Sequence, residues 1–169
     1  MMIKTILNNN AVIAIDENEK EVVIVKNGIG FNSKKGMVLK DNDMEKVFIL
    51  QEKNVSDDMI HLLSLISEEY IEVSKKIVDY GRTVLKTGVH DSIYVTLSDH
   101  IELAVSRKKK GIAFDNAMTW SIKKTYREEY HIGEVALKII QIECGVTLPE
   151  EEAGLIALHF VNAKIHNEP

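Results

Sequence analysis

The stretch Ile3-Lys-Thr-Ile-Leu-Asn-Asn-Asn-Ala-Val-Ile-Ala-Ile15 places three consecutive asparagines between two short apolar runs. Short clusters rich in β-branched residues and separated by polar residues predict strands. Two further clusters follow at residues 22–25 and 47–50. The polar break at residues 17–20 has the length of a hairpin turn, and residues 27–40, with three glycines, form a longer loop. The first part of the chain is therefore predicted to be a small four-stranded antiparallel sheet.

The third cluster, Val22-Val-Ile-Val25, is apolar on both faces of the strand that it predicts. A sheet of about 50 residues buries too little surface to be comfortably stable alone. A second copy of the chain would cover the extra apolar face and make a homodimer. The helical half of the same chain is the alternative cover, and the pattern does not choose between the two.

After residue 56 the apolar residues repeat at helical spacing. Helices are expected over residues 70–84, 93–105, 115–130 and 133–144, with a last helix that opens at 147–150. There, Thr147 and Glu150 have the spacing of a capping box, and Pro149 falls in the first turn. The fold class is thus α+β with two domains. An antiparallel sheet domain at 1–56 and an all-α helical bundle at 67–169 are joined by a linker at 57–66.

The net charge of −5 is distributed unevenly. Residues 1–56 are neutral, with eight lysines and eight acidic residues, and residues 22–40 contain four lysines and no acid. This local basic surface carries less positive charge than a typical nucleic-acid-binding surface, and an exposed, solvated loop is the plainer interpretation.

Composition also bears on where the protein resides. The single cysteine, Cys144, excludes an internal disulfide, and its apolar neighbours suggest a packed thiol. No apolar run approaches the roughly 20 residues that cross a bilayer, and the N-terminus lacks a signal-peptide pattern. We expect a cytoplasmic protein without membrane insertion.

Two of the six histidines lie at the edges of apolar helical faces. His100 shares a face with Leu97 and Ala104, and His159 is one turn from Leu155 and Ala163. Each alone is most simply a core-edge histidine. Two such residues on well-formed helices favour a shared function, because histidine can change charge, bind metal or accept a phosphoryl group near neutral pH.

An enzyme is the rival interpretation. His90-Asp91, Asp99, His100 and His159 could form a metal-dependent phosphohydrolase site of the HD type. The spacing fits poorly, because that site needs a separate upstream histidine and His61 is a weak candidate. The sequence has no complete glycine-rich phosphate loop, Cys/His metal spacing or nucleophile motif. We therefore predict no catalytic residue, metal or cofactor.

The sheet half offers a different chemistry. Carboxamides such as Asn8 and Asn10 present a donor and an acceptor together, so they can pair with base edges. Glycine at position 28 lets the backbone approach a sugar-phosphate closely, and Phe31 offers a stacking plane worth about 1–3 kcal/mol per base. The structural alternative is that the asparagines make a turn and Phe31 folds inward as a core anchor.

These residues carry a family resemblance that covers nearly the whole chain in the correct order. The segments Ile3-Lys-Thr-Ile-Leu-Asn-Asn-Asn10, Gly28-Ile-Gly-Phe31 and Glu45-Lys-Val-Phe48 resemble the co-antiterminator (CAT) RNA-binding domain of the BglG/SacY/LicT transcriptional antiterminators. The segments Asp91-Ser-Ile-Tyr-Val-Thr-Leu-Ser-Asp-His-Ile101 and Leu148-Pro-Glu-Glu-Glu-Ala-Gly-Leu-Ile-Ala-Leu-His-Phe-Val-Asn-Ala163 resemble the regulation domain that follows it.

The resemblance implies a dimer that binds a short imperfect RNA hairpin in the leader of a sugar-utilisation transcript and blocks an overlapping terminator. Positions 26 and 27 are often Gly-Arg in the family but Lys-Asn here, so either Lys26 replaces the charge-assisted RNA contact from one residue earlier or the RNA preference differs. Because strand side chains alternate faces, Asn10 and then Asn8 are expected to face the RNA, with Asn9 directed away. The expected RNA-binding residues are Lys4, Thr5, Asn8, Asn10, Lys26, Asn27, Gly28 and Phe31.

The resemblance also implies that His100 and His159 accept phosphoryl groups from the sugar phosphotransferase system, through the phosphocarrier HPr or the sugar permease, with Asp99 as polar partner of the first. The added charge would shift dimer packing of the helical domain and so unpair the two RNA-binding sheets. Family members usually carry two regulation domains, so a chain with one is expected to be a fragment or a short member. The alternatives that remain are the metal phosphohydrolase and a dimeric interaction module without RNA binding.

Overall fold

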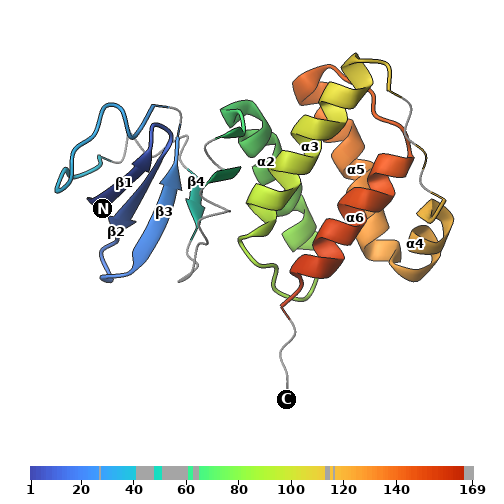
Figure 1. Cartoon of the computed structure of the whole chain (residues 1–169). Helices are drawn as coiled ribbons and strands as arrows, with labels where there is room; N and C mark the ends of the chain where they lie inside the picture. Colours follow the sequence, from blue (N-terminus) through green and yellow to red (C-terminus); the bar gives the residue numbers. More distant parts are fainter. Residues whose placement is uncertain are drawn as a thin grey trace. The chain divides into compact units, whose positions relative to one another are not determined.

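The computed structural model describes residues 1–26, 28–40, 48–50, 61–62, 65–112, 115 and 117–165. The chain forms two compact units, Met1–Glu68 and Glu69–Pro169, which are described separately. All the described strands lie in the first unit, and the described part of the second unit is mainly helical (Figure 1). The prediction of an α+β chain is therefore confirmed.

The sheet is antiparallel and follows the order of the chain. Its strands are β1 (Met2–Asn8), β2 (Ala11–Ile15), β3 (Glu21–Val25) and the short β4 (Phe48–Leu50), in the order β1-β2-β3-β4. The β2–β3 turn is closed by Asp16, whose Oδ1 accepts from the backbone N–H groups of Asn18 and Lys20, each at 2.8 Å. A side chain that satisfies two turn amides explains why a polar segment without glycine can reverse the chain here.

One face of the sheet carries the core of the first unit. Its apolar cluster comprises Ile3, Val12, Ala14, Val22, Ile24, Ile29 and Leu39. Leu39 reaches this cluster because residues 36–39 run beside β1, where the backbone N–H of Ile3 donates to Met37 O and that of Leu39 to Met1 O, both at 2.9 Å. Val23 and Val25 lie on the opposite face and are each 4% exposed in the single chain. Because these two side chains are already buried in one chain, they give no support to the argument for a homodimer.

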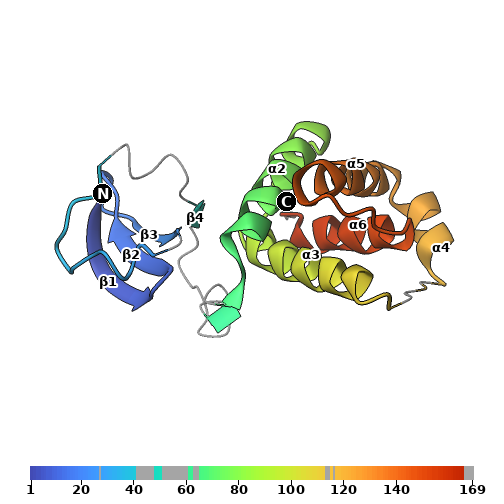
Figure 2. The same cartoon turned by 90° about the horizontal axis from the view of Figure 1, so that it is seen from above.

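The second unit contains α2 (Glu68–Val84), α3 (Ile93–Lys109), α4 (Thr119–Thr125), α5 (Arg127–Cys144) and α6 (Glu151–Ala163). Helix α6 packs against α3, α4 and α5, and in Figure 2 it lies between α3 and α5 with α4 at one end. Among the helices that the structure describes, none combines the length and the apolar content needed to cross a membrane.

Two local predictions in the helical unit are wrong. The chain is not one helix over 115–130, because it breaks at Tyr126 (φ −120°, ψ 64°) between α4 and α5. Tyr126 packs against the cluster of Ile122, Tyr130, Ala153 and Ala157, so tertiary packing decides a break that no glycine or proline signals. The capping box at Thr147 and Glu150 is also absent. Helix α6 has no side-chain cap, and Glu150 instead accepts from Tyr130 Oη at 3.0 Å.

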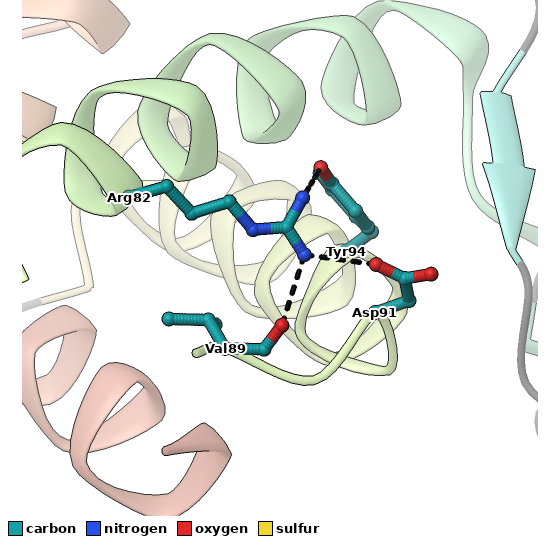
Figure 3. A network of polar contacts seen from close by, with 4 residues as sticks. All are labelled: Arg82, Val89, Asp91 and Tyr94. Carbon is teal, nitrogen blue, oxygen red and sulfur yellow. Dashed lines mark hydrogen bonds and ion pairs between the residues drawn. The ribbon is translucent and has the colours of Figure 1, made fainter. Parts of the chain in front are cut away.

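A polar network holds the start of α3 against α2 (Figure 3). The guanidinium of Arg82, near the end of α2, donates to Tyr94 Oη at 2.6 Å, Val89 O at 2.9 Å and Asp91 Oδ1 at 2.8 Å. Arg82 also lies 5.1 Å from the centre of the Tyr94 ring. The guanidinium of Arg82 thus binds a ring hydroxyl, a backbone carbonyl and a carboxylate at the same time, which fixes the path of the loop that leads into α3. It thereby sets the orientation of the helix that carries His100.

Cys144 is half-buried at the end of α5, and burial raises the pKa of its thiol. A raised pKa keeps the thiol protonated near neutral pH, which makes it a poor nucleophile. This agrees with the packed, unreactive thiol predicted from the sequence.

Candidate functional sites

The asparagine turn, residues 8–10, uses two of its side chains to hold the backbone. Asn8 Oδ1 accepts from the N–H of Asn10 at 2.8 Å, and Asn10 Oδ1 accepts from the N–H of Gly28 at 2.9 Å. Only the oxygen of a carboxamide can accept a backbone N–H, so these two bonds fix the orientation of both carboxamides. The NH₂ group of each side chain therefore points away from the backbone N–H that its oxygen binds. Asn9 is exposed. The oxygens of Asn8 and Asn10 therefore serve the turn, as the structural alternative for the triplet predicts.

The glycine loop, residues 28–32, docks on this turn. Gly30 N–H donates to Asn9 O at 2.9 Å, and Lys26 N–H donates to Asn10 O at 2.9 Å. A Cβ atom at Gly30 would collide with the carbonyl group of Asn8, so only glycine permits this approach. Residues 16 and 21 positions apart are therefore brought into one surface, with the asparagine turn and the glycine loop as neighbours.

Phe31 projects from the glycine loop and is 80% exposed. The apolar anchor of the loop is Ile29, which belongs to the core cluster, so an inward-folded Phe31 is excluded. A cavity of about 160 Å³ opens beside the loop, lined by Lys26, Gly28, Ile29, Asn32, Ser33, Met37 and Leu39. Asn27, which is also predicted from the sequence to bind RNA, lies outside the described residues.

Strand register places two more predicted RNA-binding residues together. Thr5 pairs with Ile13 and Asn8 with Ala11, so Thr5 and Asn8 share one face of the sheet after the irregularities in β1. Lys4 is exposed and forms an ion pair with Glu21. An exposed pair of this kind contributes about 0–1 kcal/mol, so Lys4 can exchange Glu21 for another anion at little cost.

The second candidate site is a histidine pair in the helical unit. His100 on α3 and His159 on α6 have ring centroids 5.0 Å apart, with planes inclined at 57°. The two histidines singled out from the sequence are thus brought into contact by the α3–α6 packing.

Glu152, which sequence reasoning missed, completes this site. Its side chain is 2% exposed; Oε2 lies 2.7 Å from His100 Nε2, and Oε1 accepts from an Arg107 Nη at 2.8 Å. A signal was available, because Glu152 and His159 are seven residues apart and so share one face of α6. Glu152 was overlooked because it is the last of three consecutive glutamates at 150–152. Asp99 is exposed, and the carboxylate that contacts His100 is that of Glu152.

Burial lowers the pKa of His159 to about 4, with a further lowering by neighbouring His100 and an opposing effect of Glu152. His159 is therefore neutral at pH 7. A neutral imidazole keeps one nitrogen lone pair available to an electrophile, which is what phosphoryl acceptance requires.

Of the residues named for the enzyme alternative, His100 and His159 lie together, and the carboxylate in contact with His100 is that of Glu152. No group of three or more His, Cys, Asp or Glu side chains suited to a metal ion occurs in the described part of the chain.

Comparison with known proteins yields one consistent family. The chain matches the CAT RNA binding domain over residues 1–57 and the PRD domain over residues 75–163. It is 42% identical over 168 residues to the transcription antiterminator LicT of Bacillus subtilis (strain 168), covering 99% of this chain and 61% of that protein. It is 36% identical over 165 residues to the beta-glucoside operon antiterminator of Dickeya chrysanthemi, covering 98% and 58%.

A solved structure is similar over the full length. The crystal structure of GlcT CAT-PRDI superposes with a TM-score of 0.78 at 31% identity, covering 98% of each chain. The chain spans 61% and 58% of the lengths of the two antiterminators named above.

Proposed function

Because the chain belongs to the BglG/SacY/LicT family of transcriptional antiterminators, we propose that it binds an imperfect RNA hairpin in the leader of a sugar-utilisation transcript and prevents an overlapping terminator from forming. Residues 1–56 form the RNA-binding domain, a four-stranded sheet that works as a homodimer. Residues 57–66 form a linker, and residues 67–169 form the regulation domain.

The observation that carries this proposal is the surface formed by the asparagine turn and the glycine loop. It combines oriented carboxamide donors, a backbone approach that only glycine allows and an aromatic ring with 80% of its surface exposed. Single-stranded or bulged RNA is recognised by this combination, because splayed bases stack on aromatics and hydrogen-bond through their edges. Lys4, Thr5, Asn8, Asn10, Lys26, Asn27, Gly28 and Phe31 are the proposed contact residues.

Regulation is proposed to act through the histidine pair. His100 and His159 accept phosphoryl groups from the sugar phosphotransferase system, with HPr or the sugar permease as donor and Asp99 beside the first site. Each phosphoryl group adds about −1.5 to −2 charges. That charge would enter a site that already holds the Glu152 carboxylate, so the packing of α3 against α6 must respond.

The enzyme alternative has no support from the family, whose matched members are regulators. A dimeric interaction module without RNA binding is the alternative that an experiment must separate. It would leave the oriented carboxamides and exposed Phe31 without a function.

Two variants that add the same charge separate a role of Asn10 in RNA recognition from its role in the turn. Asn10→Asp keeps the oxygen that accepts from Gly28 N–H but removes the NH₂ donor, and Asn9→Asp adds the same charge at the exposed neighbour. The RNA probe is a hairpin enriched on the wild-type chain from a randomised pool, with affinity measured by gel shift and stability by thermal unfolding.

We expect Asn10→Asp to bind at least about tenfold more weakly than Asn9→Asp, which corresponds to about 1.4 kcal/mol, with both variants unfolding close to the wild type. Equal affinities for the two variants, or a pool from which no hairpin is enriched, would refute the proposed RNA recognition.

A further inference from the structure

We propose that Glu152 is a positioning residue that holds His100 in its Nε2–H form and thereby makes Nδ1 the nitrogen that accepts the phosphoryl group. The inference rests on the proposed function only for the transfer itself. The protonation pattern it assigns to His100 can be measured in the unmodified chain.

The first step is the hydrogen bond between the two side chains. Glu152 Oε2 lies 2.7 Å from His100 Nε2, while Oε1 of the same carboxylate accepts from Arg107. A carboxylate can only accept, so the proton in the bond to His100 must be on Nε2. In a neutral imidazole the lone pair is then on Nδ1, the other ring nitrogen.

The second step is that this arrangement is rigid. Glu152 is 2% exposed on α6, and Arg107 comes from α3, the same helix as His100. A buried carboxylate held at both oxygens would lose both contacts if it turned away, and an unpaired buried carboxylate is costly. Within the described part of the chain, Nδ1 of His100 has no hydrogen-bond partner, and 14% of the side chain is exposed. The free lone pair thus belongs to the nitrogen that Glu152 does not contact.

The third step concerns charge during transfer. When the Nδ1 lone pair attacks phosphorus, an N–P bond forms at His100 and the bond between phosphorus and the donor atom breaks, with its electron pair leaving on the donor. The His100 ring keeps its Nε2 proton and becomes a positively charged phosphoimidazolium. That positive charge develops against the Glu152 carboxylate, which therefore stabilises the product ring as well as orienting the reactant. Attack through Nε2 would instead require this hydrogen bond to break.

His159 has no equivalent carboxylate contact among the described hydrogen bonds. Its ring faces His100, and burial keeps it neutral. The positioning by Glu152 is therefore specific to His100.

The protonation pattern is tested by NMR on the whole chain labelled with ¹⁵N-histidine, using the two-bond couplings that identify the protonated ring nitrogen. We expect His100 of the wild type to be predominantly the Nε2–H form. Glu152→Gln should convert it to a mixture, because an amide can donate to Nε2 as well as accept from it. Glu151→Gln, in the same turn of α6, should leave the wild-type pattern unchanged. A wild-type His100 protonated at Nδ1 would overturn the proposal even if the Glu152 variant fails to fold.

The acceptor nitrogen is tested with potassium phosphoramidate, a small donor from which ammonia leaves with the bonding pair. We expect the Nδ1-phosphohistidine isomer at His100, formed at least about tenfold more slowly in Glu152→Gln than in Glu151→Gln. The Nε2 isomer at His100 would overturn the acceptor assignment. No modification of His100 by phosphoramidate or by a phosphotransferase protein would overturn the proposed regulation and the acceptor assignment together, while the NMR pattern would still decide the role of Glu152 in positioning.

Discussion

In Asn8 and Asn10, the oxygen and the NH₂ group of the same carboxamide have different roles. The oxygens close the turn and anchor Gly28, while the NH₂ groups are the proposed donors to RNA. Alanine at position 10 would remove both purposes together and could not separate folding from recognition. Aspartate at this position can, because it keeps an acceptor oxygen in place.

Phe31 gives a residue-scale prediction that is free of this ambiguity. Its ring is exposed, so Phe31→Ala should weaken RNA binding by about 1–3 kcal/mol through lost stacking and leave the unfolding temperature within error. Val38→Ala, at another exposed apolar position of the same long loop, is the matched control and should keep wild-type affinity. A Phe31→Ala variant that unfolds earlier but binds normally would contradict a stacking role.

His159 gives a prediction about pH. Its pKa is about 4 in the folded chain and about 6.5 when unfolded, so below pH 6.5 the unfolded chain binds a proton that the folded chain does not. The contribution of His159 to the free energy of unfolding should be constant above pH 7. It should fall by up to about 3 kcal/mol between pH 6.5 and 4. Denaturant unfolding across this range checks the sign.

The matched variants isolate this contribution from other groups. His159→Gln should lose the steep part of the pH dependence, whereas His131→Gln, at an exposed histidine, should retain it. The same slope in both variants would show that His159 is not held neutral by burial.

At the scale of elements, the sequence was informative where local pattern and tertiary packing agree. β-Branched clusters located β1, β2 and β3, and three-four spacing located α2 and α3. The break at Tyr126 and the uncapped start of α6 escaped prediction because they depend on contacts between residues far apart in the chain. Tyr126 packs against the cluster that includes Ala153 and Ala157, and Glu150 accepts from Tyr130. The histidine pair was predictable from its helical faces, whereas Glu152 needed the α3–α6 contact to be distinguished from its neighbours.

Two helical glycines give an element-scale prediction with opposite signs. A Cβ atom at Gly133 of α5 would collide with the backbone of Ala153 in α6, so Gly133→Ala should destabilise the chain by about 1–3 kcal/mol. At Gly154 the nearest atom to a Cβ is Ile122 Cδ1 at 3.4 Å, an ordinary contact. Gly154→Ala should therefore stabilise by about 0.5–1 kcal/mol through helix propensity. Thermal or denaturant unfolding that ranks the two variants the other way would contradict the close α5–α6 approach.

At the scale of the whole molecule, each unit has its own core and its own candidate site. The first unit carries the asparagine turn and the glycine loop, and the second carries the histidine pair. Such a division suits a regulator, because a charge added in the second unit leaves the candidate site of the first unit chemically unchanged. The proposed homodimer has no support from strand pattern, since Val23 and Val25 are buried in the single chain.

The central claim is that two copies of this chain recognise one RNA hairpin through their sheet units. Native mass spectrometry of the chain mixed with the selected hairpin measures it directly, because the masses of protein and RNA are additive and unambiguous. The account predicts a dominant complex of two chains and one RNA that is lost with Asn10→Asp and retained with Asn9→Asp. A complex of one chain and one RNA, or no complex with a hairpin that the chain itself selected, would contradict it.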